Sequence, residues 1–321
     1  MNRKDFLGAV LALGGVALSP AKASVLESFG DLAEAGAAKK LDPSLVVFLS
    51  DIHICGEIED GKPKHYPYNP TSLSLRIKEI LAMRSLPANV VVTGDVAWDY
   101  GMEEDYHYAA ELLQPLVEAG IRVTLGLGNH DRRAAFFKVF PQYKESSPIA
   151  GRAVSVVELP DADLIVLDTL SELPDLKPRQ GTTVSGAIDK EQLTWLQGFL
   201  AKAARPVLLC AHHPIGDMPG LVKLVTDSPA VAGYIYGHVH IWNKSVSILR
   251  QRVPQRMLST VALPATFYGD IGCATMRVDK NGAKIGYSSK GFWWPQPSEN
   301  PPQEWEQRQK DLADEKCTIC F

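Results

Sequence analysis

The sequence predicts an α/β fold built around a mainly parallel β-sheet. Short apolar runs rich in Val, Ile and Leu alternate with segments whose apolar residues recur at helical spacing, which is typical of βαβ units. The chain has 321 residues, of which 45% are hydrophobic and 22% charged. This length allows one large domain or two smaller ones, and a core of that size needs no disulfide to fold.

Six apolar runs are the candidate parallel strands: 45–49, 89–93, 121–127, 164–167, 206–211 and 231–236. We predict helices between them over 73–84, 103–119 and 190–204. Asp189 and Gln192 have the spacing of a capping box at the start of the last helix. After residue 256 the runs become short (256–263, 271–278 and 283–287), and Asn281-Gly282 is a typical hairpin turn between two of them.

The two ends of the chain are predicted to lie outside the main domain. Residues 1–23 have the pattern of an export signal, with a basic start, a short apolar run and an Ala-x-Ala site. An uncleaved amphipathic helix is the alternative. Arg3-Lys4 before Phe6-Leu7 resembles a twin-arginine signal with one lysine, so the Sec and twin-arginine routes both stay open. We expect an exported protein, periplasmic or extracellular, with a linker at 24–44, a domain at 45–293 and a Pro-rich, charged tail at 294–321.

The overall charge excludes one class of partner. A net charge of −4 and a pI of about 6.1 leave no global basic surface for a nucleic acid duplex. Beyond the signal, no window of the sequence is apolar enough for a transmembrane helix. Five cysteines are too few for a disulfide scaffold. Cys317 and Cys320 could form a disulfide or half of a zinc site, although a disordered tail is the simpler reading.

Polar clusters follow five of the six candidate strands, and they contain six of the eight histidines. Because sites in open α/β sheets form at the carboxyl ends of strands, we expect these clusters to converge. A strand-end turn with packed histidines would explain any single cluster, but five in this order favour one shared site. The clusters are Asp51-Ile52-His53, Gly94-Asp95, Gly128-Asn129-His130-Asp131, His212-His213-Pro214 and Gly237-His238-Val239-His240.

The residue types in these clusters indicate a metal site. Carboxylate, imidazole and amide oxygen without a set of thiolates suit divalent or trivalent Fe, Mn or Zn, and the sequence does not select among them. Asp95 comes alone after its strand and is the natural bridge between two ions. His238 and His240 are two residues apart, so they could bind two neighbouring ions.

The ordered set D-x-H, G-D, G-N-H-D, H-x-P and G-H-x-H resembles that of the calcineurin-like metallophosphoesterase family, over residues 46 to about 290. The V-T-G-D-V segment followed by Gly101 and Glu104, with G-x-x-D-x-x-Q-x-x-W-L at 186–196, resembles the class III cyclic-nucleotide phosphodiesterase-like branch. The resemblance implies a four-layer α/β/β/α sandwich of two mixed sheets flanked by helices. It also makes 45–293 a catalytic domain.

The resemblance further implies a role for each cluster. His130 would contact the substrate phosphate and assist the leaving oxygen, and Asp131 would orient His130. Trp98 stands where purple acid phosphatases have a tyrosine, so a ferric-tyrosinate centre is not expected. The implied ligands are Asp51, His53 and His240 for a first metal, Asn129, His212 and His238 for a second, and Asp95 as the bridge.

The leading functional hypothesis is a phosphodiesterase that uses two metal ions and a bridging hydroxide on a small phosphate ester, with nucleotides as candidates. A phosphomonoesterase or nucleotidase and a noncatalytic metal-binding module are the alternatives. His213 and Arg132 are candidate substrate contacts, and Arg133 is either a phosphate contact or a solvated residue. Asp168 is expected to be structural, and the oligomeric state is left open. Five aromatic residues could stack on a nucleobase or pack against their own loops: Tyr66, Tyr68, Trp98, Tyr100 and Trp242.

Overall fold

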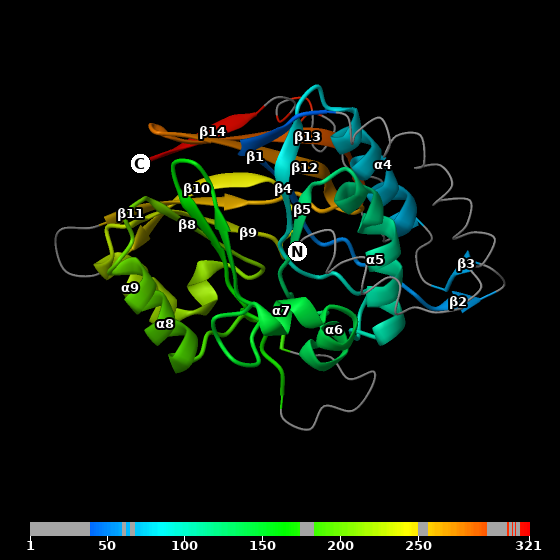
Figure 1. The fold of residues 1–321 in the computed structure, drawn as a ribbon, viewed down its shortest axis with the longest axis horizontal. Coiled ribbons are helices and arrows are strands. Elements are labelled where there is room, and N and C mark those ends of the chain that lie inside the picture. Colours follow the sequence, from blue (N-terminus) through cyan, green and yellow to red (C-terminus); the bar gives the residue numbers. More distant parts are fainter. Residues whose placement is uncertain are drawn as a thin grey trace.

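The computed structural model places two six-stranded sheets face to face, with helices on both outer sides (Figure 1). It describes residues 39–59, 62–64, 68–173, 183–249, 256–293 and 315–321, together with 307, 310 and 312. Each sheet contains both parallel and antiparallel pairs. The predicted four-layer arrangement of two mixed sheets flanked by helices is confirmed.

The first sheet has the strand order β14-β13-β12-β1-β4-β5, in which β1, β4 and β5 are parallel. Helices α4 and α5 pack on its outer face, and the short α6 and α7 follow β5. A two-stranded ribbon, β2-β3, lies outside both large sheets. The bounds are β1 (Leu41–Leu49), β2 (Ile58–Glu59), β3 (Lys62–Pro63), α4 (Tyr68–Ala82), β4 (Leu86–Val92), α5 (Glu103–Glu118), β5 (Arg122–Leu125), α6 (Arg133–Val139), α7 (Pro141–Glu145), β12 (Gly269–Asp279), β13 (Gly282–Trp293) and β14 (Lys316–Cys320).

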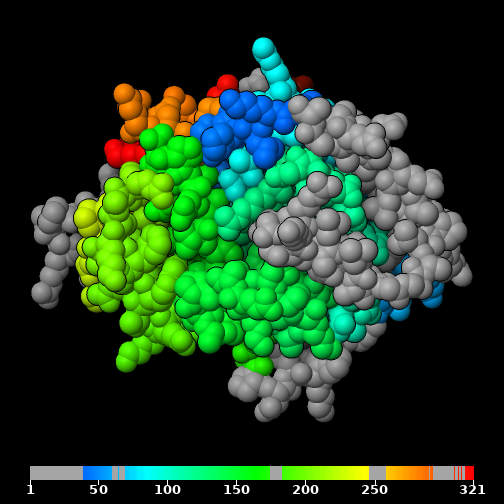
Figure 2. Space-filling model, in the orientation of Figure 1, coloured from blue at the N-terminus to red at the C-terminus, as the bar shows by residue number. Residues whose placement is uncertain are grey.

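The second sheet has the order β10-β11-β9-β8-β7-β6, in which β11, β9, β8 and β7 are parallel. Helices α8 and α9 cover its outer face. Figure 2 shows the surface on this side, with α8 and α9 in yellow-green beside α6 and α7 in green. The bounds are β6 (Ser155–Glu158), β7 (Asp163–Val166), α8 (Lys190–Leu200), β8 (Val207–Ala211), the 3₁₀ turn η1 (Ile215–Asp217), α9 (Pro219–Asp227), β9 (Val231–Tyr236), β10 (Asn243–Leu249) and β11 (Arg256–Ala262).

The continuous apolar runs of the sequence arise because the central strands are buried on both faces. In β1, Val46 and Phe48 pack between the sheets against residues of β7, β8 and β9. Val47 and Leu49 point the other way and pack under α4 and α5. Side chains that alternate along β1 therefore pack into two separate apolar layers, one on each face of the sheet. The polar residues lie at the strand ends.

The structure extends the predicted domain at both ends. Strand β1 begins at Leu41, inside the predicted linker, and β14 adds an edge strand to the first sheet from within the predicted tail. Neither segment shows the long apolar run that identified the central strands. The predicted export signal lies outside the described residues and stays a prediction.

Local predictions at the turns are confirmed in part. Asp279 pairs with Gly282 across the predicted hairpin turn. The Asp189 side chain accepts a 2.7 Å hydrogen bond from the backbone N–H of Gln192 and caps α8. The Gln192 side chain does not complete a capping box, because it binds the backbone N–H and C=O of Asp168 at 3.0 and 2.8 Å. Gln192 therefore ties α8 to the end of β7.

The cysteines are free thiols, and Trp242 belongs to the core. All five cysteines are described and all are free thiols, and Cys317 and Cys320 lie on β14. Trp242 is buried, stacks on Tyr287 with ring centroids 5.3 Å apart, and donates its indole N–H to Glu315. Of the two readings of Trp242, packing agrees with the structure and stacking on a nucleobase does not, since its ring belongs to the core between the sheets.

Each helix in the described part of the chain is too short or too polar to cross a lipid bilayer.

A buried ion pair links α6 to the second sheet. The Arg133 guanidinium donates to both carboxylate oxygens of Asp168, at 2.8 and 2.7 Å, and to Glu172 at 2.6 Å. Asp168 directly follows β7 and is fully buried. Both readings of Arg133, as a phosphate contact or a solvated residue, are therefore wrong, whereas the structural role of Asp168 is confirmed. This link fixes the start of α6, and with it the preceding loop, against β7.

Replacing Arg133 should be costly, since it leaves the Asp168 charge buried without a partner. We expect Arg133→Met to lower the free energy of unfolding by about 3–5 kcal/mol. Lys138→Ala on the same helix removes an exposed ion pair with Glu103 and should cost at most about 1 kcal/mol. Urea unfolding of both variants at equal metal content measures the difference, and equal costs would contradict the prediction.

Candidate metal centre

The polar clusters meet at one edge of the two sheets. Asp51 and His53 follow β1, Asp95 follows β4, and Asn129 and His130 follow β5 of the first sheet. His212 follows β8 and the pair His238 and His240 follows β9 of the second sheet. Short distances between these side chains, given below, show that the structure brings the seven predicted ligands together.

One group of ligand atoms joins Asp51, His53, Asp95 and His240, all within 4.8 Å of one another. All four residues are buried. His240 Nε2 lies 3.0 Å from Asp51 Oδ1, and His53 Nε2 lies 3.6 Å from Asp95 Oδ2. This group can hold one metal ion.

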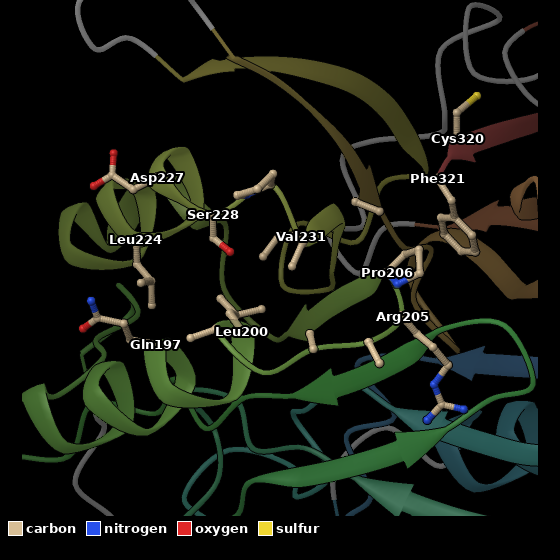
Figure 3. Close-up of a pocket in the computed structure, with 16 residues that line it drawn as sticks. Gln197, Leu200, Arg205, Pro206, Leu224, Asp227, Ser228, Val231, Cys320 and Phe321 are labelled. Carbon is tan, nitrogen blue, oxygen red and sulfur yellow. The ribbon is translucent and has the colours of Figure 1, made fainter.

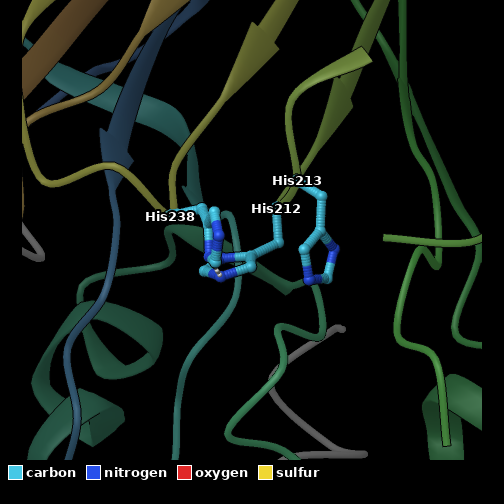
Figure 4. Close-up of side chains that lie close together, drawn as sticks. All are labelled: His212, His213 and His238. Carbon is cyan, nitrogen blue, oxygen red and sulfur yellow. Dashed lines mark hydrogen bonds between the residues drawn. The ribbon is translucent and has the colours of Figure 1, made fainter. Parts of the chain in front are cut away.

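A second group surrounds the ring of His212. Its Nε2 atom lies 3.2 Å from each of three atoms: Asp95 Oδ2, Asn129 Oδ1 and His238 Nδ1. His212, His213 and His238 lie close together, and their ligand atoms are within 4.8 Å of one another (Figure 4). Asp95 therefore contacts both groups, in the position predicted for a bridging carboxylate.

The backbone at these residues is strained. Within the described part of the chain, five non-glycine residues have positive φ, and all are candidate ligands: Asp51 (52°), His53 (42°), Asp95 (48°), His238 (69°) and His240 (55°). Such conformations cost of order 1–3 kcal/mol each and persist where the surroundings over-determine them. In the loops after β1 and β9, the left-handed conformations bring two residues that are two positions apart to the centre: Asp51 with His53, and His238 with His240.

One close approach requires a glycine. A Cβ atom on Gly128 would lie 2.1 Å from Asp95 Oδ1, so a side chain at this position would displace the carboxylate. The backbone N–H of His130, two residues on, donates to the same oxygen at 2.9 Å. The loop after β5 thus lies directly against Asp95.

The hydrogen bonds around the first group leave electron pairs facing one another. His53 Nδ1 lies 2.9 Å from the carbonyl oxygen of Trp98, and it must carry the ring proton, since the carbonyl can only accept. His53 Nε2 therefore presents a lone pair, and it is buried without a hydrogen-bond partner. Asp51 Oδ1 is also buried without one. Buried lone pairs at such distances are stabilised by a cation between them, so these residues fit a metal ion.

The pKa values agree with ligands that bind a cation. Burial lowers the pKa of His53 to about 4, which keeps the imidazole neutral, as metal binding requires. Burial opposes ionisation of Asp95, but the neighbouring His212 and His130 outweigh it and hold the pKa of Asp95 well below its ordinary value. A neutral His53 nitrogen thus lies beside the ionised carboxylate of Asp95.

The His130 side chain lies beside the ligands and is 31% exposed. Its ring centroid is 4.8 Å from that of His53. His130 Nδ1 lies 3.1 Å from Asp99 Oδ1. Burial opposes protonation of His130, but the charges of Asp95 and Asp99 outweigh it and raise the pKa of His130 to about 9.

The group that orients His130 is Asp99, whereas Asp131 was expected from the resemblance. The Asp131 carboxylate is buried and accepts hydrogen bonds from the backbone N–H groups of Val96, Ala97 and Gly128, and from the Tyr106 hydroxyl. It thereby ties the loop after β4 to the loop after β5. The reason is local: neighbouring residues in a turn point in different directions, so Asp131 faces inward while His130 faces the ligands.

The two candidate substrate contacts differ in exposure. His213 is fully buried, its Nδ1 lies 2.8 Å from the Thr169 hydroxyl, and burial lowers its pKa to about 2. Arg132 is half-buried, and its guanidinium donates to the carbonyl of Asp131 at 2.7 Å. His213 therefore lies in the wall of the site, whereas part of Arg132 reaches solvent.

Sequence reasoning missed several residues of the site. Asp99 follows Asp95 by four positions, and a search for carboxylates near the G-D motif could have found it. Phe267 and Tyr268 come from a loop without any motif, yet Tyr268 has its ring centroid 3.9 Å from that of His240. No sequence signal identifies this loop. Tyr66 lies outside the described residues, as does the side chain of Tyr68.

A hollow of about 860 Å³ lies away from this centre (Figure 3). It lies at the opposite ends of β8 and β9 from the histidines, and no candidate site residue lines it. The residues labelled around it include Leu200, Arg205, Pro206, Val231 and Phe321.

Comparison with known families agrees with the geometry. The model of the calcineurin-like phosphoesterase family matches residues 44–242, which contain all seven candidate ligands and His130. The chain belongs to the calcineurin-like phosphoesterase family. The predicted family and fold are confirmed, and the family is one of phosphoric ester hydrolases, as the predicted enzyme class requires.

Relatives of this phosphoesterase agree with the predicted branch. A probable cyclic nucleotide phosphodiesterase of Rhodopseudomonas palustris is 37% identical over 176 residues, which are 53% of this chain and 57% of the relative. The chain thus matches little more than half of that relative's length. The structure of PhoD superposes with a TM-score of 0.53 at 12% identity, covering 78% of this chain and 66% of PhoD, which shows a shared fold alone.

Removing the shared carboxylate should lower metal content. We expect Asp95→Ala to reduce the metal bound per chain, because Asp95 is in close contact with both groups. Asp227→Ala, which alters an exposed carboxylate on α9, is the matched control. Elemental analysis after dialysis measures the content, and a wild-type value in Asp95→Ala would show that Asp95 is not a ligand.

Proposed function

We propose that this chain is a metal-dependent phosphodiesterase whose centre holds two metal ions. The observation that carries the proposal is Asp95, whose carboxylate lies 3.6 Å from His53 Nε2 in one ligand group and 3.2 Å from His212 Nε2 in the other. A single carboxylate between two sets of nitrogen and oxygen atoms suits two neighbouring cations. Divalent or trivalent Fe, Mn and Zn are the candidate ions.

In this proposal Asp51, His53 and His240 hold one ion, Asn129, His212 and His238 hold the other, and Asp95 contacts both. The ions, when bound, supply Lewis-acid charge for phosphoryl oxygens and lower the pKa of water. The protein keeps its ligand atoms fixed through strained turns and buried hydrogen bonds. Fixed ligands do not have to reorganise as charge develops on the phosphate.

His130 is the proposed catalytic residue outside the ligand set. Asp99 holds its Nδ1 atom at 3.1 Å, and the ring is partly exposed beside the ligands. An imidazole held in this way can donate a proton from Nε2 to the leaving oxygen, or a hydrogen bond to the phosphate. A noncatalytic metal-binding module would need no such exposed histidine–carboxylate pair, which favours an enzyme.

The diester preference is supported by the relative from Rhodopseudomonas palustris, a probable cyclic nucleotide phosphodiesterase. We therefore propose small phosphate diesters as the substrate class, with cyclic nucleotides as the leading candidates. A monoesterase or nucleotidase would use the same ligands, so the two functions are separated by assay.

The test of the proposed function is hydrolysis of two esters by protein of known metal content. We expect bis(p-nitrophenyl) phosphate to be hydrolysed faster than p-nitrophenyl phosphate, and the activity to be lost on chelation and regained with Mn, Fe or Zn. The reverse preference would indicate a monoesterase. Inactivity on both esters at full metal occupancy would indicate a binding module.

His130→Ala should separate catalysis from metal binding. We expect turnover to fall about a hundred-fold or more while metal content stays at the wild-type value, because His130 acts on the ester and not on the ions. Asp99→Asn should also keep the metal and lower turnover by less. If His130→Ala keeps wild-type turnover, the assigned role is wrong.

A further inference from the structure

Aromatic rings gather on one side of the centre, around the first ligand group. The ring centroids of Trp98, Phe267 and Tyr268 lie 6.0, 5.6 and 6.0 Å from that of His53. The ring centroid of Tyr268 is also 3.9 Å from that of His240. Among the described residues, the ring neighbours of His212 and His238 in the second group are other histidines. The two sides of the centre therefore differ in chemistry.

The three rings differ in exposure. Phe267 is 3% exposed and packs beneath the others, with its centroid 4.4 Å from Tyr268 and 6.4 Å from Trp98. Trp98 and Tyr268 are only half-buried. The two outer rings therefore both contact a buried third ring, and part of each outer residue is exposed beside the ligands.

The loop that carries Tyr268 is anchored to the ligand loops. Both the backbone N–H and the hydroxyl of Thr266 donate to the carbonyl of Ser50, at 3.1 and 2.9 Å. The backbone N–H of Asp270 donates to the carbonyl of His240 at 2.8 Å. Gly269 has φ 79°, and a Cβ there would lie 2.1 Å from the same carbonyl oxygen. Tyr268 is thus held in a fixed place between two anchors.

Trp98 is also anchored at the centre, through its own backbone and through the next residue. Its carbonyl accepts the His53 ring proton, and the next residue, Asp99, contacts His130. The backbone of Trp98 is therefore part of the centre, while its indole is half-exposed. Two pre-positioned aromatic side chains cost little conformational entropy when they bind a ligand.

We propose that Trp98 and Tyr268 bind a planar ring in the organic group of the phosphate ester, as a nucleobase would provide. This inference rests on the proposed function, which places the phosphate at the ligands. A ligand with an anionic end and a flat apolar end matches a cation site beside an aromatic surface. Every nucleobase can stack on an aromatic ring. We therefore expect Trp98 and Tyr268 to favour esters with a planar ring over aliphatic esters, without favouring one base over another.

The experiment compares two ligands that differ only in the base, AMP and ribose 5-phosphate, by calorimetric titration of the metal-loaded full chain. We expect the wild-type protein to bind AMP about ten-fold more tightly, the usual size of one base–aromatic stack. Tyr268→Ala and Trp98→Leu should bring this ratio towards one and leave ribose 5-phosphate binding unchanged, which also shows that the variants are folded.

Two matched variants identify the ring as the cause. Tyr268→Phe keeps the ring and should keep the ten-fold ratio, and a ratio near one in this variant would overturn the stacking role. Trp195→Ala, a half-buried aromatic residue on α8, should change nothing. A ratio lost equally in Trp195→Ala would likewise overturn the inference.

Different results would contradict the ring site and the phosphodiesterase function. A wild-type protein that hydrolyses bis(p-nitrophenyl) phosphate yet binds both ligands equally overturns the ring site and leaves the phosphodiesterase standing. A ten-fold ratio that Tyr268→Ala abolishes, in a protein that hydrolyses no ester, supports the ring site and overturns the function.

Discussion

Mutual repulsion between electron pairs at the carboxyl ends of the strands is the constraint on which the rest of this molecule depends. Asp51 Oδ1 and His53 Nε2 are buried without hydrogen-bond partners, and they lie beside Asp95 and His240, so lone pairs face one another in a buried place. Such an arrangement is unfavourable unless positive charge occupies the centre. The folding energy of three apolar layers must therefore hold in place a set of side chains that would otherwise separate.

The two sheets contribute different halves of this set, so the distance between the sheets sets the geometry of the centre. The apolar layer between them fixes that distance through Val46 and Phe48 on one side and Leu208 and Ile235 on the other. Polar links also hold the loops at the edge of the two sheets. Arg133 joins the start of α6 to Asp168, and Thr266 joins the loop before β12 to Ser50. Strain at the ligands is tolerated because each ligand loop is held from more than one direction.

The sequence predicted which polar residues converge at the strand ends, but it did not predict the residues that support them, for a physical reason. A ligand needs a particular residue type at a strand end, and His, Asp and Asn are visible there against an apolar run. A residue that supports a ligand loop needs only to contact it, and many residue types can do so from a distant part of the chain. Thr266, for example, donates a hydrogen bond to the carbonyl of Ser50, 216 positions away. Asp131 shows the converse error: the family resemblance implied that it orients His130, but the turn points the two side chains apart.

The same distinction explains why substrate preference is harder to read than reaction class. The reaction class follows from the candidate metal site, because the residue types at the strand ends determine which chemistry that site can perform. Substrate preference depends on the side chains that the loops around that site present. Here Tyr268 contacts His240 from a loop that has a glycine, Gly269, at positive φ. Gly269 matters because its missing side chain lets the loop lie against the His240 carbonyl, and that contact sets where the neighbouring aromatic ring stands. A backbone approach of this kind leaves no pattern in the sequence, although it decides which face of the centre is aromatic.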